Sequence, residues 1–436
     1  MSTQPAAIPR VPFEKAAVTQ TDRGKRVKQR DYLTEGRIPV IDQGQSQVGG
    51  YTNDEDFAFI GELPVVLFGD HTRAVKLVDR RFALGADGIK IFRPAEGVRA
   101  KYLYHWMKSV HLPDRGCGRH YQYLRRLSLP LPSPKQQDEI VAEIEKQFSR
   151  LDQAVANLKR AKANLKRYTA AVLGAAVGGG LVPTEAALAR VQGRAYESGE
   201  SLLRRISEAR KGQREGKGKF SMPEGLSAAE LPSLPDGWVW TTAMQACDVV
   251  VDCHNKTAPY VPAGIPLVRT TNIRDGRLLF EDMRYVDQPT YDFWSRRCPP
   301  KPGDVLFTRE APMGEAAVIP PGLKICLGQR TMLMRPSAAL DKGFLLAALM
   351  SPVVRSLIDR VAVGSGVKHL RVGDVERIAV PLPPLAEQNR IVAELDRRLS
   401  IVREVEAVVD ANLLRAQALR QEVLSRKFHA RGEGDR

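Results

Sequence analysis

One stretch of this sequence occurs twice, and it constrains the fold more than any other feature. Residues 130–144 and 381–395 align without a gap at a constant offset of 251 residues. Two long copies in one register indicate a duplicated element in a duplicated chain. The first copy contains Pro130-Leu131-Pro132, Gln137 and Ile140-Val141-Ala142-Glu143-Ile144, and the second contains Pro381-Leu382-Pro383, Gln388 and Ile391-Val392-Ala393-Glu394-Leu395.

An apolar stripe follows each copy in the same register. Its steps of three and four residues are typical of a coiled-coil seam, and they predict two long helices that pack on each other. Ordinary helical core is the alternative for a single stripe, but it does not explain the shared register. Polar residues interrupt the seam at Lys162, Thr169, Glu406 and Arg420. The seam residues are Phe148, Leu151, Val155, Leu158, Leu165 and Val172 in the first copy, and Leu399, Val402, Val409, Ala416 and Val423 in the second.

The repeat divides the 436 residues into two half-chains of similar plan. Short apolar strands broken by Gly and Asp precede each helix, so we expect an α+β fold with two similar mixed α/β domains. Ser133-Pro134-Lys135-Gln136 reads as a capping box that starts the first helix. The expected order is a first domain at 1–132, a long helix at 133–178, a hinge helix and flexible linker at 179–235, a second domain at 236–383 and a second long helix at 384–430.

The two expected domains contain matching segments in the same order. The second helix of the chain is expected at Glu200 to Lys211, and the glycine-rich Gly212 to Lys219 is expected to be a mobile linker. The matching segments are Ile38 to Ile41 with Ile265 to Val268, Val66 to Phe68 with Val305 to Phe307, Leu84 to Pro94 with Leu327 to Pro336, and Gly116 to Arg125 with Gly364 to Arg371.

Charge and composition narrow the class of partner. The net charge of +16 and the pI near 9.7 favour a polyanion, and nucleic acid is favoured over a membrane surface. No apolar run approaches the roughly 20 residues that span a bilayer, and residues 1–10 lack a signal-peptide core. We therefore expect a cytoplasmic protein. The five cysteines are scattered, and Cys247, Cys253 and His254 match no zinc spacing, so no metal site is predicted.

Several enzyme motifs are missing from the sequence. Gly216-Lys217-Gly218-Lys219 has neither the spacing nor the preceding strand of a phosphate-binding loop. No Asn/Asp-Pro-Pro-aromatic stretch of the amino-methyltransferases is present, and neither Pro113-Asp114 nor Pro235-Asp236 is followed by the acidic-x-Lys pair of a nuclease. Asp70-His71 could form an acid/base pair, but a positioned polar contact is the better interpretation. No catalytic residue is predicted.

These features together resemble the specificity subunit of Type I restriction-modification enzymes. The family's order of target-recognition domain, conserved helix, second target-recognition domain and second conserved helix covers nearly the whole chain. The first domain departs from the pattern because Val11-Pro12-Phe13 stands where the second has Pro235-Asp236-Gly237-Trp238. The residues that carry the resemblance are Pro130 to Ile144, Pro381 to Leu395, Glu200 to Ile206 and Leu234 to Trp238.

The resemblance implies a non-catalytic DNA-recognition subunit used in defence against phage. Each domain would bind one half of a split, asymmetric target, and the helices would form an antiparallel coiled coil with a pseudo-twofold axis. Helices of about 40 residues reach roughly 60 Å and would act as a ruler between the halves. Two adenine-methyltransferase subunits and further motor/endonuclease subunits would be the partners. S-adenosylmethionine, ATP and magnesium would bind to those partners, and none to this chain.

Base edges are read by Arg, Lys, Asn and Gln, so polar clusters after strands or in glycine loops are the candidate DNA-binding residues. For each one, a solvated surface or a structural turn is about as probable as DNA contact. In the first domain they are Gln43, Gln45, Gln47, His71, Arg73, Lys76, Arg119, His120, Tyr121 and Gln122. In the second they are Arg269, Thr270, Asn272, Arg274, Thr308, Arg309, Lys368 and His369.

Two alternatives remain open from the residues alone. One is a specificity subunit of a related system whose methylase and nuclease share one partner chain. The other is a catalytic DNA-modifying enzyme with an unrecognised site. Turnover by the purified chain would separate the second alternative from a binding subunit, and neighbouring reading frames would identify the first.

Overall fold

The structure is a computed structural model that describes residues 8–22, 25–85, 88–113, 116, 118–214 and 231–429. The chain forms two compact units: unit 1 comprises residues 1–161 and 408–436, and unit 2 comprises residues 162–407. The long helices α4 (Pro134–Val177) and α12 (Leu385–Phe428) each contribute one part to each unit. Within the described residues, none of the helices combines the length and the apolar character needed to cross a membrane.

Short strands in three sheets build unit 1. They are β1 (Arg10–Pro12), β2 (Ala17–Gln20), β3 (Ile38–Ile41), β4 (Gly50–Thr52), β5 (Val65–Gly69), β6 (Val75–Val78), β7 (Ala83–Leu84), β8 (Ile89–Pro94) and β9 (Ser128–Pro130). The main sheet is antiparallel with the order β2-β8-β5-β6. In the second sheet, β3 lies antiparallel to β4 and parallel to β7, while β1 pairs with β9.

Three short helices and several aromatic side chains pack against one face of the main sheet in unit 1. The helices are α1 (Phe13–Ala16), α2 (Ala100–Ser109) and α3 (Tyr121–Leu124). The Phe13 ring lies edge-on to Phe92 at 5.0 Å and stacks on Trp106 at 5.7 Å. Tyr102 is buried, and its hydroxyl donates to the carbonyl of Pro130 at 2.8 Å, so α2 is fixed to β9.

Unit 2 repeats this arrangement with additional short elements. Its strands are β10 (Val239–Thr242), β11 (Cys247–Asp252), β12 (Ile265–Val268), β13 (Ile273–Arg274), β14 (Arg277–Leu278), β15 (Arg284–Val286), β16 (Val305–Thr308), β17 (Ala316–Val318), β18 (Cys326–Leu327), β19 (Thr331–Pro336) and β20 (Ala379–Leu382). The main sheet has the order β11-β19-β16-β17, the second has β15-β12-β18, and β10 pairs with β20. The β13-β14 hairpin has no counterpart among the described residues of unit 1.

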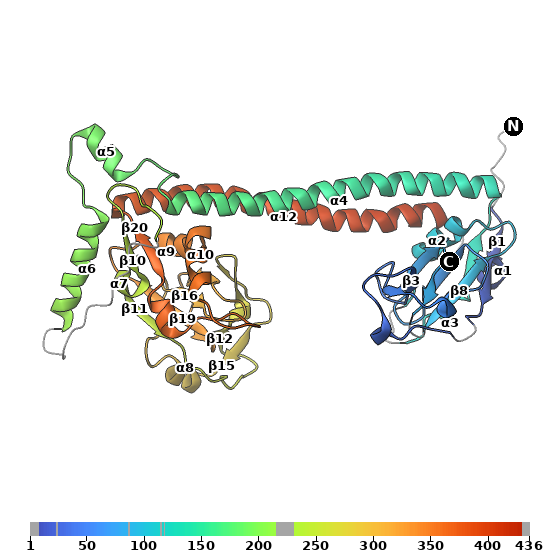
Figure 1. Cartoon of the computed structure of the whole chain (residues 1–436), viewed down its shortest axis with the longest axis horizontal. Helices are drawn as coiled ribbons and strands as arrows, with labels where there is room; N and C mark the ends of the chain where they lie inside the picture. The colour runs from blue at the N-terminus through green and yellow to red at the C-terminus, as the bar shows by residue number, and fades with distance from the viewer. Residues whose placement is uncertain are drawn as a thin grey trace. The chain divides into compact units, whose positions relative to one another are not determined.

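Helices α9 (Lys342–Met350) and α10 (Pro352–Val361) of unit 2 lie between its main sheet and the long helices (Figure 1). The other short helices are α7 (Ala243–Ala246) and α11 (Val372–Glu376), which contribute to the same core, and α8 (Gln288–Trp294), which packs against β18. The side chains of Asp341 and Ser351 cap α9 and α10, because each accepts hydrogen bonds from backbone N–H groups of the first turn. Phe344 and Leu345 of α9 are fully buried in the core.

Three of the four predicted segment matches agree with the strand pairing. Strand β3 corresponds to β12, β5 to β16, and the β7-β8 segment to β18-β19. The fourth match was wrong in its register. The Leu124 carbonyl accepts from Leu127 N, and the Val375 carbonyl accepts from Ile378 N in the same way, so Leu124 corresponds to Val375 and not to Leu370. The loops differ in length there, which is why sequence matching misaligned them.

The repeated glutamine has the same structural role in both units. Gln137 and Gln388 are fully buried at the start of α4 and α12. Gln137 Nε2 donates to the carbonyls of Gly97 and Pro132 at 2.9 Å, and its Oε1 accepts from Arg99 N at 2.8 Å. Gln388 bonds in the same way to Ala339 O, Pro383 O and Asp341 N. Each glutamine thus joins the start of a long helix to the turn that leads into α2 or α9.

The predicted pair of long antiparallel helices is confirmed. The capping box is also present, since Ser133 N donates to Gln136 Oε1 at 3.1 Å and Gln136 N donates to Ser133 Oγ at 3.4 Å. Every predicted seam residue is buried or half-buried. In unit 1 the seam break Arg420 forms an ion pair with Asp152, and its guanidinium lies 5.0 Å from the Phe148 ring centroid.

The segment between the first long helix and unit 2's strands contains two helices, α5 (Glu185–Gln192) and α6 (Gly199–Arg214). Helix α6 continues to Arg214, so the prediction that the linker begins at Gly212 was wrong. Glycine is tolerated there because one glycine in a helix lowers its stability by only about 1 kcal/mol relative to alanine. The rest of the predicted linker, residues 215–219, lies outside the described residues. The predicted domain boundaries themselves stay a prediction.

Candidate nucleic-acid interface

Three loops of unit 1 meet around Asp70, which follows β5. His120 N and Nδ1 both donate to the Asp70 carbonyl at 2.9 Å. Tyr121 N donates to Asp70 Oδ1 at 2.7 Å. Asp70 N in turn donates to Gly88 O at 2.7 Å. Asp70 therefore holds the loop before α3 and the loop before β8 against the β5-β6 turn, in agreement with its interpretation as a positioned polar contact.

The loop after β3 joins the same cluster. Thr72 Oγ1 donates to the carbonyl of Gln43, and a Cβ at Gly88 would lie 2.8 Å from His71 Cδ2 and 3.0 Å from Gln43 Oε1. Gly88 has φ +92°, a conformation in which a side chain would be strained as well as obstructed. The absence of a side chain at Gly88 is thus what lets the Gln43 and His71 loops approach each other.

The predicted residues of unit 1 differ in accessibility. Lys76 is 3% exposed, its Nζ donates to Asp42 O at 2.7 Å, and burial lowers its pKa although the Asp42 carboxylate opposes that shift. His120 is also buried. Both side chains therefore stabilise the loops and neither faces solvent, and their predicted contact with DNA stays a prediction. Tyr121 is half-buried against Phe92, and the exposed or half-buried remainder is Gln43, Gln45, Gln47, His71, Arg73, Arg119 and Gln122.

Unit 2 gathers the corresponding loops in the same way. Arg309 N donates to Arg330 O at 2.9 Å, and Leu370 N donates to Arg309 O at 3.0 Å. Thr270 Oγ1 donates to Ala311 O at 3.0 Å, which ties the loop after β12 to the β16-β17 turn. A short antiparallel bridge pairs Glu310 with His369. Both units therefore present three loops at equivalent ends of their main sheets.

Two predicted residues of unit 2 are buried and hold turns. Asn272 Nδ2 donates to Leu279 O and Glu281 O at 3.2 Å, and Thr308 Oγ1 donates to Pro312 O. Both side chains are at most 1% exposed and do not face solvent, and their predicted contact with DNA stays a prediction. The accessible candidates of unit 2 are Arg269, Thr270, Arg274, Arg309, Lys368 and His369, of which Lys368 is the most open to solvent.

Arg330 and Glu310 belong to the unit 2 cluster, and sequence reasoning missed both. Arg330 Nε lies 3.1 Å from Glu310 Oε2, and the side chains are 49% and 27% exposed. Arg330 occupies the position in unit 2 that Gly88 occupies in unit 1. The Gly88 carbonyl accepts from the backbone N–H of the residue after β5, and the Arg330 carbonyl accepts from that of the residue after β16. The repeated segment 327–336 contained this signal, since aligning it with 84–94 from the shared Arg-Pro end sets Arg330 opposite Gly88.

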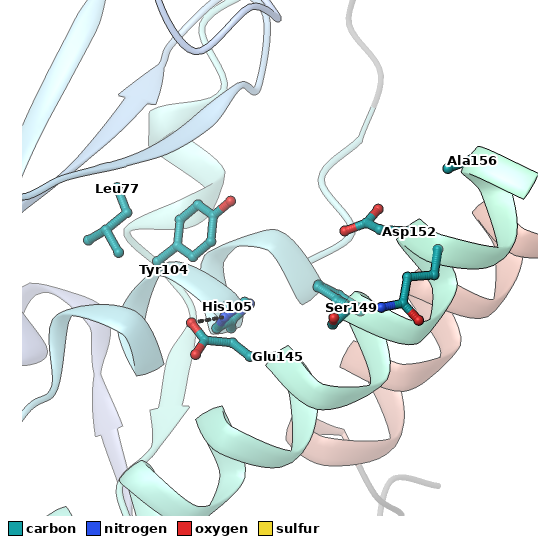
Figure 2. Close-up of a pocket in the computed structure, with 9 residues that line it drawn as sticks. Leu77, Tyr104, His105, Glu145, Ser149, Asp152 and Ala156 are labelled. Carbon is teal, nitrogen blue, oxygen red and sulfur yellow. Dashed lines mark ion pairs between the residues drawn. The ribbon is translucent and has the colours of Figure 1, made fainter.

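A separate open pocket of about 580 Å³ lies in unit 1 between α2 and α4 (Figure 2). His105 is at its base, with Nε2 3.9 Å from Glu145 Oε1, and Asp152 lies farther along α4. Burial lowers the pKa of His105 to about 4, so its imidazole is neutral near pH 7. Phe148 and Leu77 give the pocket an apolar side. Within the described chain, no group of three or more His, Cys, Asp or Glu side chains has metal-site geometry.

Part of unit 2, including three of its loops, is similar to a known protein family. Residues 295–406 match the family model described as the Type I restriction modification DNA specificity domain. This part of unit 2 is therefore similar to Type I DNA specificity domains. The matched stretch includes β16 to β20 and the first part of α12, and it contains the Arg309, Arg330 and Lys368 loops.

Relatives of the chain support the same family and confirm the predicted resemblance. The Type I restriction enzyme EcoBI specificity subunit of Escherichia coli is 24% identical over 306 residues, which cover 70% of this chain and 58% of that protein. The EcoAI specificity subunit of Escherichia coli is 29% identical over 227 residues, covering 48% of this chain and 36% of that protein. These matches thus span between about a third and three fifths of the relatives' lengths.

A solved structure has the same fold over nearly the whole chain. It comes from a study of complex assembly and conformational transition of the type I R-M system. The TM-score is 0.62 at 17% sequence identity, and the alignment covers 98% of this chain and 99% of the other. This similarity extends the fold assignment from the matched specificity domain to unit 1.

Proposed function

We propose that this chain is the non-catalytic, sequence-specific DNA-binding subunit of a Type I restriction-modification complex. Unit 1 and unit 2 would each read one half of an asymmetric, two-part target. The observation that carries the proposal is the duplicated loop cluster, in which three loops with exposed Arg, Lys, Gln and His side chains gather at equivalent sheet ends. Such side chains supply the donors that read base edges and bind phosphates.

The relatives are named as subunits of restriction enzymes, and this supports partner proteins for the proposed function. We propose two methyltransferase subunits and further motor/endonuclease subunits as these partners. S-adenosylmethionine, ATP and magnesium would then bind to the partners. The duplication of the chain supports two copies of one partner, because two similar surfaces on one polypeptide can bind two identical subunits.

Selection of randomised duplex DNA on the purified full chain tests this function. The expected result is a motif in two parts separated by unspecified positions, with micromolar or tighter affinity for the selected duplex. Incubation of the chain alone with the same duplex, with Mg²⁺ or with S-adenosylmethionine, should give neither cleavage nor methylation. Selection of no motif would contradict sequence-specific binding, and turnover by the chain alone would favour the catalytic alternative.

A further inference from the structure

We propose that Arg330 and Glu310 together read one G·C base pair in the half-target bound by unit 2. The inference rests on the proposed function and identifies a base pair within it. Arg330 follows the β18 strand and Glu310 lies in the β16-β17 turn, so two different loops bring the pair together. The guanidinium Nε and the carboxylate Oε2 are 3.1 Å apart at the surface of the cluster.

The backbone of Arg330 shows that the fold itself does not require an arginine there. Its φ is +69°, in the left-handed region that side chains seldom adopt, whereas the counterpart in unit 1 is Gly88 at φ +92°. Both residues accept the same backbone hydrogen bond from the end of the central strand. Glycine serves this turn without strain in unit 1. The arginine side chain in unit 2 is therefore present for another reason, and non-glycine residues in strained turns cluster at functional sites.

Stabilisation by the ion pair is not a sufficient reason. An exposed ion pair raises the equilibrium constant for folding by at most about a few fold. The Arg330 side chain is about half exposed. Its neighbour Arg309 has a different role, since its side chain donates to Leu370 O at 3.1 Å within the cluster. The Arg330 guanidinium thus lies beside the Glu310 carboxylate, and about half of the arginine side chain stays accessible to a ligand.

The Glu310 carboxylate favours a base over a phosphate as the ligand of Arg330. A phosphate would be repelled by Glu310, which lies within ion-pair distance of the arginine. A G·C pair in the major groove instead presents two acceptors, guanine O6 and N7, beside one donor, the cytosine N4 amino group. Arginine supplies two N–H donors and glutamate supplies an acceptor. The pair thus matches the donor and acceptor pattern of G·C and opposes a phosphate.

Selection of randomised duplexes on the full chain tests the assignment, with variants compared at one salt concentration. Arg330→Gly removes the side chain and suits the left-handed backbone, so it should fold as well as the wild type. Arg330→Gly and Glu310→Gln should each lose preference at the same G·C position and retain the rest of the motif. Replacing that guanine by 7-deazaguanine should weaken wild-type binding about tenfold and leave Arg330→Gly within about twofold of its own affinity. Arg190→Ala, an exposed arginine of α5 paired with Asp236, is the matched control.

The outcomes separate this inference from the function on which it rests. A uniform loss of affinity across all sequences, with a smaller salt dependence, would assign Arg330 to phosphate and overturn the inference while the proposed function stands. Relaxation at different positions in the two variants, or at none, would also overturn it. Failure of the wild type to select any motif would instead reject the proposed function, and the inference with it.

Discussion

His105 is a buried base whose protonation opposes folding. Burial is the largest influence on its pKa and lowers it to about 4, the nearby Glu145 carboxylate raises it, and Lys108 and Lys101 lower it further. An unfolded histidine titrates near 6.5. The folded state therefore prefers the neutral ring. This preference contributes fully to stability above pH 6.5, and it is lost as the pH falls from about 6.5 towards 4.

Replacing His105 by glutamine should flatten the acid dependence of unit 1. Wild-type unit 1 should lose up to about 3 kcal/mol of unfolding free energy between pH 7 and pH 4 through this one group. The variant His105→Gln lacks this contribution, so its loss of unfolding free energy over the same pH range should be smaller by that amount. Thermal unfolding across this pH range measures the difference. Gln153→Ala alters the lining of the same pocket without a titrating group and should follow the wild-type curve. Equal slopes for His105→Gln and wild type would contradict the assignment.

Polar residues after strands and in glycine loops indicated candidate loops, and in each unit the structure brings those loops together. Their contact with DNA stays a prediction, and the sequence did not predict the direction of every side chain. Sequence could not show that Lys76 points inward to Asp42, or that Asn272 and Thr308 bond their own turns, because one polar residue can serve either purpose. Arg330 was missed because its importance depends on a backbone conformation and on Glu310, a residue of another loop.

At the scale of elements, the repeated glutamine explains why the start of each long helix is so similar in sequence. Each amide satisfies two carbonyls and one N–H in a fully buried position. Glutamate could not donate to the carbonyls, and a shorter side chain would not reach them. The helix start and the turn before α2 or α9 are thereby fixed together. Such a constraint on one residue type is visible in sequence as an exact repeat.

Gln137→Ala should destabilise unit 1, and Gln388→Ala should destabilise unit 2. Each substitution leaves buried carbonyl and N–H groups unpaired, and one such group costs about 1–3 kcal/mol, so a loss of about 2–4 kcal/mol is expected. Calorimetry, which resolves the unfolding of separate units, gives the measurement. Gln153→Ala on the exposed face of α4 should change stability by less than about 0.5 kcal/mol. A loss below 1 kcal/mol for both buried variants would contradict the role assigned to them.

Helix prediction was strongest where periodicity continued longest. Both 44-residue helices were predicted within a few residues of their observed ends, because the seam repeats over many turns. Helix α5 was not predicted as a separate element. Its eight residues contain too few turns for a periodic signal, and tertiary contacts hold it in place, including Glu185 N donating to Glu387 Oε2 at 2.8 Å.

For the whole molecule, duplication predicts that the two loop clusters act independently. Arg119 lies before α3 in unit 1 and Lys368 before α11 in unit 2, and both side chains are exposed. The two residues belong to different units. Free energies of substitutions at separate sites usually add. For the proposed DNA binding, the net charge of +16 predicts an affinity that falls with salt, since bound phosphates release counterions.

Arg119→Ala and Lys368→Ala should each weaken binding to the selected duplex about fivefold or more at physiological salt, and the double variant should show the product of the two effects. Fluorescence anisotropy with a labelled duplex over a salt series measures both affinity and salt dependence. Arg190→Ala should bind as the wild type does. Unchanged affinity for both single variants would exclude these loops from the interface, and a double variant no weaker than the singles would contradict independence.

The bonds made by Gln137 and Gln388 have a consequence for how such chains change over time. All six hydrogen-bond partners are backbone atoms, three in each unit. The joint between helix and domain therefore depends on the backbone path of a turn and not on its side chains. The carbonyls of Pro132 and Pro383 belong to the repeated segment itself, so a domain needs to present only one carbonyl and one N–H in that geometry to satisfy the same glutamine. The loops of each unit can therefore change in sequence and length while its joint to the long helix stays as it is.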